Sequence, residues 1–214
     1  MDFLPEDIDK YVCDHSDAES QLLADINRDT YKNVLKPRML SGHLQGRVLA
    51  MLSHMVQPKR ILEIGTFTGY SALCFAEGLC EDGKIITLDI NEEIEDRVRA
   101  NFDNSPFADK IDYRIGNALD LIPAIDEVFD LIFIDADKIN YPKYYDLIFD
   151  KVRQGGFIII DNVLWSGKVV PERRKKFDKD TEAIVNFNKQ VHDDIRVENV
   201  LFPIRDGLMI LRKK

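Results

Sequence analysis

From residue 60 onwards, short apolar runs alternate with segments of helical spacing, and this alternation most narrows the folds open to the chain. Several of the apolar runs are continuous, for example residues 131–134 and 157–160. Continuous runs indicate strands that are buried on both faces, as in a parallel sheet covered by helices. The sequence therefore predicts an α/β fold with a doubly wound sheet. The predicted strands span residues 60–65, 84–90, 111–118, 129–136, 155–162, 196–204 and 207–213.

Helical spacing of apolar residues occurs between these strands and before the first one. The predicted helices span residues 19–35, 43–56, 70–79, 92–102, 118–125, 141–152 and 181–192. Only Arg205 and Asp206 separate the last two strands, and a parallel crossover needs a dozen residues or more. We therefore expect a seven-stranded, mostly parallel sheet in which the last strand is antiparallel.

Length, charge and cysteine content exclude several classes of protein. A chain of 214 residues suits one large domain. Its net charge of -9 argues against a surface that binds nucleic acid throughout, and favours small-molecule ligands. Cys13, Cys74 and Cys80 are odd in number and lack paired metal spacing, which favours a reducing compartment. The sequence begins without a signal-like segment and has no 18 consecutive apolar residues, so we expect a cytoplasmic protein.

Polar or glycine residues follow five consecutive predicted strands, at the edge of the sheet where open α/β folds bind ligands. In chain order they are Glu63 and Gly65, Asp89, Gly116 and Asn117, Asp135, and Asp161 with Asn162.

The segment LEIGTFTGYS predicts a strand, a glycine-bearing turn and the start of a helix. Gly65 and Gly69 are four residues apart, and no G-x-G-x-x-G motif for a dinucleotide occurs. Asp89 lies where a carboxylate that binds ribose is expected, and Ser71 can cap the helix or bind the ligand. Glu63 would repel phosphates and suits a cation, so S-adenosylmethionine fits better than a dinucleotide. The alternative is a tight turn with Asp89 as a helix cap.

Asp135, Asp161 and Asn162 offer only carboxylate and amide oxygens at the ends of two successive strands. Such ligands select magnesium, calcium or manganese over zinc. The alternative is structural: Asp135 or Asp137 would cap the next helix, and Asp161 and Asn162 would form a turn. A zinc site is disfavoured because the histidines are scattered, at His15, His43, His54 and His192.

With the motifs LEIGTFTGYSAL, DADKINY and DNVLWSGKV, the chain resembles the cation-dependent, S-adenosylmethionine-dependent O-methyltransferases of the caffeoyl-CoA and catechol type. The similarity extends from about residue 39 to the terminal RDGLMILRK. It implies a Rossmann-like class I methyltransferase in a single domain, residues 1–214. Residues 1–57 would form helices that cover the cofactor and substrate, and residues 58–214 would form the core. The resemblance also implies a homodimer.

The resemblance assigns roles to individual residues. The implied metal ligands are Asp135, Asp161 and Asn162. The implied cofactor contacts are Leu40 and Ser41 at the methionine end, Glu63, Gly65, Ser71, Asp89 at the ribose, Asn117 and Ala118 near the adenine, and Asp135. Lys138 matches the catalytic lysine. The chain departs from the animal catechol enzyme at Ala136-Asp137, where that enzyme has an aromatic pair, and at Pro203, which replaces a glutamate. It therefore looks closer to the plant and bacterial caffeoyl-CoA branch.

The implied reaction is methylation of one hydroxyl of a vicinal dihydroxy aromatic such as caffeate, caffeoyl-CoA or a catechol. A phenol with a pKa of about 10 must lose its proton, and chelation by a divalent cation promotes that loss. Lys138 is the candidate base, because a neighbouring cation disfavours the charged form of a lysine. Alternatively, Lys138 pairs with Asp137 or only orients the substrate. Asp137 itself is expected to be solvated.

Two further segments each have two alternative roles. Trp165 is expected either to form an aromatic wall for the substrate or to pack the loop. The charged loop 168–180, with the basic run at 173–176, would contact an anionic substrate such as a coenzyme A thioester or RNA, or would simply be solvated. The alternatives for the whole chain are methylation of a hydroxylated base in tRNA and, more remotely, a nicotinamide-dependent oxidoreductase or a nucleotide-binding module.

Overall fold

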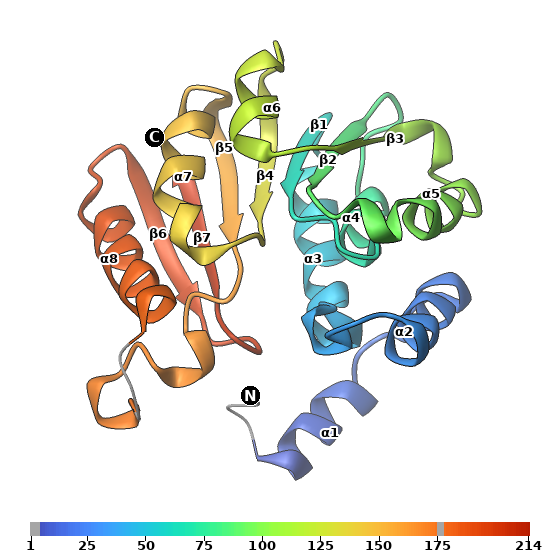
Figure 1. Ribbon diagram of the computed structural model, residues 1–214, viewed down its shortest axis with the longest axis horizontal. Helices are drawn as coiled ribbons and strands as arrows, with labels where there is room; N and C mark the ends of the chain where they lie inside the picture. The colour runs from blue at the N-terminus through green and yellow to red at the C-terminus, as the bar shows by residue number, and fades with distance from the viewer. Residues whose placement is uncertain (1–4, 175–177) are drawn as a thin grey trace. The chain divides into compact units, whose positions relative to one another are not determined.

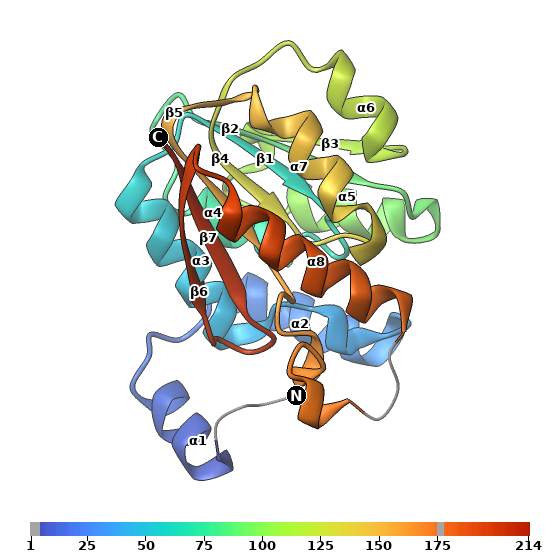
Figure 2. The ribbon, with the colours of Figure 1, turned by 90° about the vertical axis from the view of Figure 1, so that its left-hand side faces the viewer.

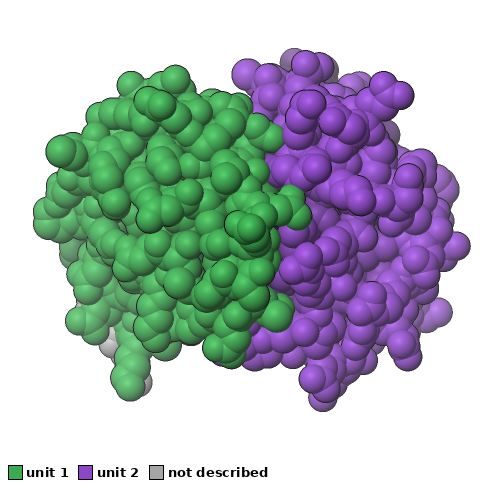
Figure 3. Space-filling model, turned by 90° about the horizontal axis from the view of Figure 1, so that it is seen from above, with its two compact units in different colours: residues 1–3, 118–214 green, residues 4–117 purple. Residues whose placement is uncertain are grey.

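The structure is a computed structural model in which residues 5–174 and 178–214 are described. The described residues divide into two compact units, residues 5–117 and residues 118–174 with 178–214 (Figure 3). That the two units form the single domain expected from the sequence stays a prediction.

The first unit contains three parallel strands and five α-helices (Figure 1). Its strands are β1 (Arg60–Ile64), β2 (Lys84–Asp89) and β3 (Ile111–Ile115). Its α-helices are α1 (Glu6–Asp14), α2 (Gln21–Asn33), α3 (Gly42–Val56), α4 (Tyr70–Ala76) and α5 (Glu95–Asp103). Short 3-10 helices are η1 (Pro37–Met39), η2 (Glu92–Ile94) and η3 (Ala108–Lys110). β2 pairs with β1 and with β3 in parallel, and Glu63 of β1 lies opposite Thr87 of β2.

The second unit contains four strands and three α-helices. Its strands are β4 (Phe129–Ile134), β5 (Val152–Ile160), β6 (Val197–Phe202) and β7 (Leu208–Lys213). Its helices are α6 (Ala118–Ala124), α7 (Tyr141–Phe149) and α8 (Lys179–Asp193), with short 3-10 helices η4 (Lys138–Asn140), η5 (Trp165–Gly167) and η6 (Pro171–Arg173). β4 and β5 are parallel, and β7 is antiparallel to both β5 and β6.

The sheet has seven strands in the order β3-β2-β1-β4-β5-β7-β6. This confirms the predicted α/β fold with an antiparallel pair at the end of the sheet. The reversed strand, β7, lies between β5 and β6. In the second unit, α7 and α8 lie side by side (Figures 1 and 2), and Phe187 makes edge-to-face contacts with Tyr141 and Tyr145. These contacts hold the first turn of α7, which follows the candidate site.

Two differences from the predicted elements have local causes. Helix α1 was not predicted: none of its residues is buried, although the acidic residues of its first turn favour a helix N-terminus. β5 begins at Val152 rather than at Gly155, because the pairing with β4 shifts register between Phe129 and Leu131. Gly155, at φ +73°, adopts a conformation within β5 that other residues rarely take.

The cysteines and the helices are both relevant to the expected location of the protein. Cys13, Cys74 and Cys80 are all free. Within residues 5–174 and 178–214, no helix has both the length and the apolar character needed to cross a bilayer. A cytoplasmic location stays a prediction.

Close packing of α3 against the end of α4 gives a test of the fold. A Cβ added at Gly78 would lie 2.3 Å from the backbone nitrogen of His54, so the backbone would have to move. We expect Gly78→Ala to lower the free energy of unfolding by about 2 to 3 kcal/mol, measured by urea denaturation. Gly155→Ala is the control: its Cβ has ordinary contacts and its positive φ costs only about 1 kcal/mol. Equal losses in the two variants would contradict this packing.

Candidate functional site

In the first unit, backbone hydrogen bonds bring the carboxyl ends of three strands together. The Gly65 N–H donates to Leu88 O at 2.9 Å, and the Gly116 N–H donates to Asp89 O at 2.8 Å. Gly65 and Gly116 both have positive φ, at 102° and 151°, which lets the backbone leave each strand sharply. The predicted cofactor residues that follow β1, β2 and β3 are thereby gathered at one edge. Asn117, the last of them in this unit, is exposed.

Asp89 shapes the turn between β1 and α4. Its Oδ2 accepts from the Phe67 N–H at 2.6 Å, and its Oδ1 accepts from the Asn91 N–H at 2.9 Å. The cap of the following helix is Asn91, whose side chain accepts from the Glu93 N–H, so the alternative of Asp89 as the helix cap is wrong. Each carboxylate oxygen accepts more than one hydrogen bond, so Asp89 can hold the turn and still accept from a ligand hydroxyl.

Glu63 is completely buried, and two hydroxyl groups donate to its carboxylate. Ser71 Oγ donates to one oxygen and Thr87 Oγ1 donates to the other, both at 2.5 Å. Ser71 therefore does not cap α4, whose N-cap is Gly69. These two neutral hydroxyls hold the carboxylate of Glu63 in a fixed position.

Leu40 and Ser41 are both buried, 3% and 6% exposed, between η1 and the start of α3. Their predicted contact with the cofactor is through the backbone, and it stays a prediction. Ala118, the first residue of α6, is likewise buried in the second unit.

In the second unit, the parallel pairing of β4 and β5 places two carboxylates at neighbouring strand ends. Ile134 pairs with Ile160, and the Asp161 N–H donates to Ile134 O at 3.0 Å. Asp135 and Asp161 are therefore the first residues beyond two adjacent strands. Asp161 is only 3% exposed, and its Oδ1 accepts from the Asn162 N–H at 2.6 Å.

Lys138 connects these two acidic residues. Its Nζ donates to Asp135 Oδ1 at 3.0 Å and to Tyr141 Oη at 2.6 Å, and Tyr141 Oη donates to Asp161 O at 3.0 Å. Burial, and then the carboxylate of Asp135, raises the pKa of Tyr141 well above its usual range, so its hydroxyl keeps the proton that it donates. The ammonium of Lys138 is 9% exposed and compensates the charge of Asp135.

Asp137 has a separate set of partners. Asn140 Nδ2 donates to its Oδ2 at 2.6 Å, and Tyr144 Oη donates to its Oδ1 at 2.5 Å. The alternative that Lys138 pairs with Asp137 is therefore wrong, because its ionic partner is Asp135. Asp137 is exposed, as expected for a solvated residue.

The loop after β5 places Trp165 beside Lys138. Asn162, Trp165 and Ser166 have positive φ of 59°, 47° and 54°. Asp206 holds this loop, because its carbonyl accepts from the Leu164 N–H at 2.8 Å and its carboxylate accepts from Ser166. The Trp165 ring centre lies 5.9 Å from Lys138 Nζ, which is within cation–π range.

The oxygen atoms at the ends of β4 and β5 suit a hard divalent cation. Among the described residues, no group of three or more His, Cys, Asp or Glu side chains could hold a metal ion. The predicted set has only two carboxylates, with the Asn162 amide as its third donor. It therefore fits magnesium, manganese or calcium, whose remaining ligands are commonly water or substrate oxygens.

With this geometry in view, the chain can be compared with known proteins. A model of the O-methyltransferase family matches residues 13–214. The chain belongs to the O-methyltransferase family. This confirms the resemblance found in the sequence and the prediction of an enzyme, and the oxidoreductase and non-catalytic alternatives are wrong.

Relatives of this O-methyltransferase are known by sequence and by structure. It is 38% identical to a caffeoyl-CoA O-methyltransferase of Eucalyptus globulus over 178 residues, 79% of this chain and 72% of that one. It is also 38% identical to caffeoyl-CoA O-methyltransferase 1 of Arabidopsis thaliana over 182 residues, 79% of this chain and 69% of that one. A Bacillus cereus O-methyltransferase in complex with SAH matches with a TM-score of 0.87 and 31% identity, covering 97% of each chain.

Three residues of the site were not found from the sequence. Thr87 lies in the middle of β2, and only its pairing with Glu63 shows that the two side chains meet. Asp206 reaches the loop after β5 from the turn between β6 and β7. Tyr141 was detectable, because it lies three residues after Lys138, a spacing that brings side chains together in a helical turn.

The two hydrogen bonds of Tyr141 predict a measurable loss of stability. Tyr141→Phe leaves the buried carbonyl of Asp161 without this donor and Lys138 without this acceptor. We therefore expect the free energy of unfolding to fall by about 2 kcal/mol. Tyr144→Phe is the matched control, because its acceptor, Asp137, is exposed and can bind water instead. We expect the free energy of unfolding of that variant to fall by only about 0.5 kcal/mol, with both variants measured by urea denaturation. A loss in Tyr144→Phe as large as that in Tyr141→Phe would contradict the assignment.

Proposed function

We propose that this O-methyltransferase transfers a methyl group from S-adenosylmethionine to one hydroxyl of a vicinal dihydroxy aromatic compound, with a divalent cation bound at Asp135, Asp161 and Asn162. The observation that carries the proposal is the arrangement of these residues with Lys138 at the ends of two adjacent parallel strands. The caffeoyl-CoA O-methyltransferases among the relatives support an aromatic substrate.

The cofactor would bind at the ends of the strands of the first unit. Asp89 would accept hydrogen bonds from the ribose hydroxyls, and Glu63 would provide negative charge for the cationic parts of the ligand. Gly65 and Ser71 would line the turn, Leu40 and Ser41 the methionine end, and Asn117 and Ala118 the adenine. The support comes from the fold: a methyltransferase of Podospora anserina that is bound to SAH matches with a TM-score of 0.91 and 27% identity, covering 100% of this chain and 99% of that one.

The acidic site in the second unit would supply the other requirement, an activated hydroxyl. When bound there, a divalent cation would lower the pKa of a chelating phenol and fix the position of its oxygen. Magnesium is the first candidate, with manganese and calcium as alternatives, because all three prefer oxygen ligands. The buried Asp161 and the half-buried Asp135 come from rigid strand ends, which suits a site of fixed geometry.

With a divalent cation bound beside it, Lys138 would be in its neutral form and would accept the proton of the reacting hydroxyl. Asp135 and Tyr141 hold its nitrogen at 3.0 and 2.6 Å, so the atom that receives the proton is fixed before the substrate binds. Trp165, beside Lys138, would contact the aromatic ring of the substrate.

An anionic substrate contact by the loop 168–180 stays a prediction. Lys168 pairs with Asp178 at 3.0 Å, and Arg174 donates to the carbonyls of Lys168 and Val169. Lys168 and Arg174 therefore have structural partners, and residues 175 and 176 of the basic run lie outside the described residues. Methylation of tRNA, the alternative to a small-molecule substrate, would need such a basic surface, and no described contact favours it. The homodimer also stays a prediction.

Removal of the metal tests the cation requirement. We expect the purified enzyme, assayed with S-adenosylmethionine and caffeoyl-CoA, caffeate or catechol, to lose activity in EDTA and to regain it with added magnesium. Asp161→Ala should lower kcat at least about 100-fold while the Kd for S-adenosylmethionine, measured by calorimetry, changes less than about twofold. Asp137→Ala is the control for loss of a nearby carboxylate and should retain metal-dependent activity. Full activity after rigorous metal removal would refute the cation requirement.

Substitutions of Lys138 separate a base from an orienting group. Lys138→Ala removes the proton acceptor, and we expect kcat to fall about 100-fold with little change in cofactor affinity. Lys138→Arg retains a positive donor that cannot give up its proton, so we expect a similar loss. Rates measured between about pH 6 and 9 provide the comparison. If Lys138→Arg keeps most of the activity, Lys138 only orients the substrate.

A further inference from the structure

The turn between β1 and α4 holds one non-glycine residue, Phe67, in a backbone conformation that its side chain disfavours. Gly65, Phe67 and Gly69 have positive φ of 102°, 48° and 84°. Glycine takes such angles without penalty, but Phe67 is strained there by steric contact with its own side chain. A strained turn keeps its shape only when surrounding groups hold it. The residues that hold it therefore control the shape of the surface that this turn presents to a ligand.

One support comes from α2 and reaches the middle of the turn. Thr30 Oγ1 donates to Thr68 Oγ1 at 3.2 Å, and the two side chains are 1% and 0% exposed. From α5, Asn101 Nδ2 donates to Thr68 O at 3.0 Å. Water cannot replace a bond between two buried hydroxyls without a change in packing, so Thr30 fixes Thr68 directly.

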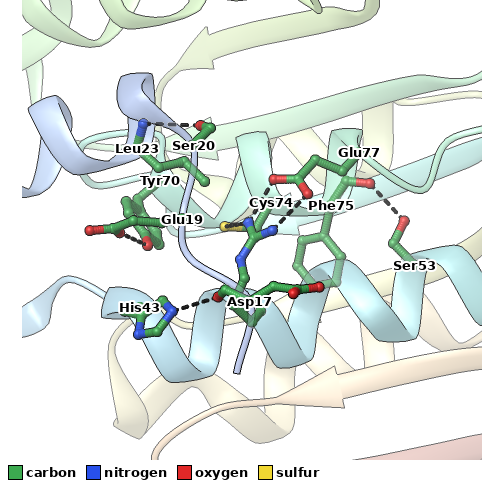
Figure 4. A network of polar contacts seen from close by, with 11 residues as sticks. Asp17, Glu19, Ser20, Leu23, His43, Ser53, Tyr70, Cys74, Phe75 and Glu77 are labelled. Atoms are coloured by element: carbon green, nitrogen blue, oxygen red, sulfur yellow. Dashed lines mark hydrogen bonds and ion pairs between the residues drawn. The ribbon is translucent and has the colours of Figure 1, made fainter. Parts of the chain in front are cut away.

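A second support comes from the segment that precedes α2. Tyr70 Oη donates to Glu19 Oε2 at 2.5 Å, and His43 on α3 contacts Asp17 O at 2.7 Å (Figure 4). The phenol ring of Tyr70 is 1% exposed and lies against Gly46, where an added Cβ would come within 2.7 Å of the ring. Tyr70 thus has little freedom to move, and its position sets the start of α4 directly after Gly69.

We propose that Thr30 and Tyr70, with Glu19 as the partner of Tyr70, are positioning residues that hold the turn from Gly65 to Ser71 in the shape that binds S-adenosylmethionine. They act on cofactor affinity without touching the reacting atoms. The inference rests on the proposed function, because it requires this turn to contact the cofactor. Nothing in the sequence pattern indicates these roles, since Thr30 and Glu19 lie 38 and 51 residues from their partners.

Substitution of Thr30 tests the first support. Thr30→Val keeps the shape of the side chain and removes its hydroxyl, and Thr30→Ser retains the hydroxyl. We expect Thr30→Val to raise the Kd for S-adenosylmethionine, measured by calorimetry, about five- to tenfold, and Thr30→Ser to stay within about twofold of wild type. The KM for the cofactor should rise by the same factor in Thr30→Val while kcat is retained. If Thr30 had only a structural role, both variants would have a lower Tm, and their Kd values for S-adenosylmethionine would not differ in this way.

A pair of tyrosine substitutions tests the second support. Tyr70→Phe should also raise the Kd about five- to tenfold. Tyr145→Phe is the matched control, because Tyr145 is equally buried and its hydroxyl donates to Asp194 in the second unit. It should lower the Tm and leave the Kd unchanged. Wild-type affinity in both Thr30→Val and Tyr70→Phe would overturn this inference alone, whereas a wild-type protein that binds no S-adenosylmethionine would overturn the proposed function and this inference together.

Discussion

The parallel pairing of β4 with β5 is the constraint on which the candidate metal site depends. The hydrogen bond from the Asp161 N–H to Ile134 O fixes the register at the ends of these strands. A shift by one residue would send the side chain of Asp161 to the opposite face of the sheet. Asp135 and Asp161 can act together only in this register. The buried strands therefore determine the geometry of the site, and the charged residues that follow them supply its chemistry.

Backbone hydrogen bonds also bring strand ends together in the first unit, but there the acidic residues have different partners. The bonds of Gly65 and Gly116 to the end of β2 gather Glu63 and Asp89, but here the acidic groups are held by hydroxyls and backbone N–H groups. In the second unit a lysine compensates Asp135. Carboxylates held by neutral donors favour a positively charged organic ligand, and neighbouring carboxylates with an amide favour a hard cation. Each unit thus carries residues for one of the two requirements of the proposed cation-assisted methyl transfer.

The residues at the strand ends could be predicted from the sequence because each buried strand and the polar residue that ends it are adjacent in the chain. An apolar run that stops at Asp135 or at Asp161 shows both a buried strand and its polar end. The partners of these residues could not be predicted in the same way. Thr87 meets Glu63 through strand register, and Thr30 meets Thr68 through the packing of α2 on a turn 38 residues away. The early start of β5 was missed because it depends on a register shift in the pairing with β4, between Phe129 and Leu131.

Direct measurement of metal binding tests the central claim, that the ends of β4 and β5 hold a divalent cation. Metal-free protein is titrated with Mn²⁺, and the free ion is followed by its electron paramagnetic resonance signal in water. We predict that a single ion binds to each wild-type chain and that Asp135→Ala, checked for its fold by circular dichroism, loses this binding. A wild-type protein that leaves the free signal undiminished, or a folded Asp135→Ala variant that binds Mn²⁺ as tightly as wild type, would contradict the account.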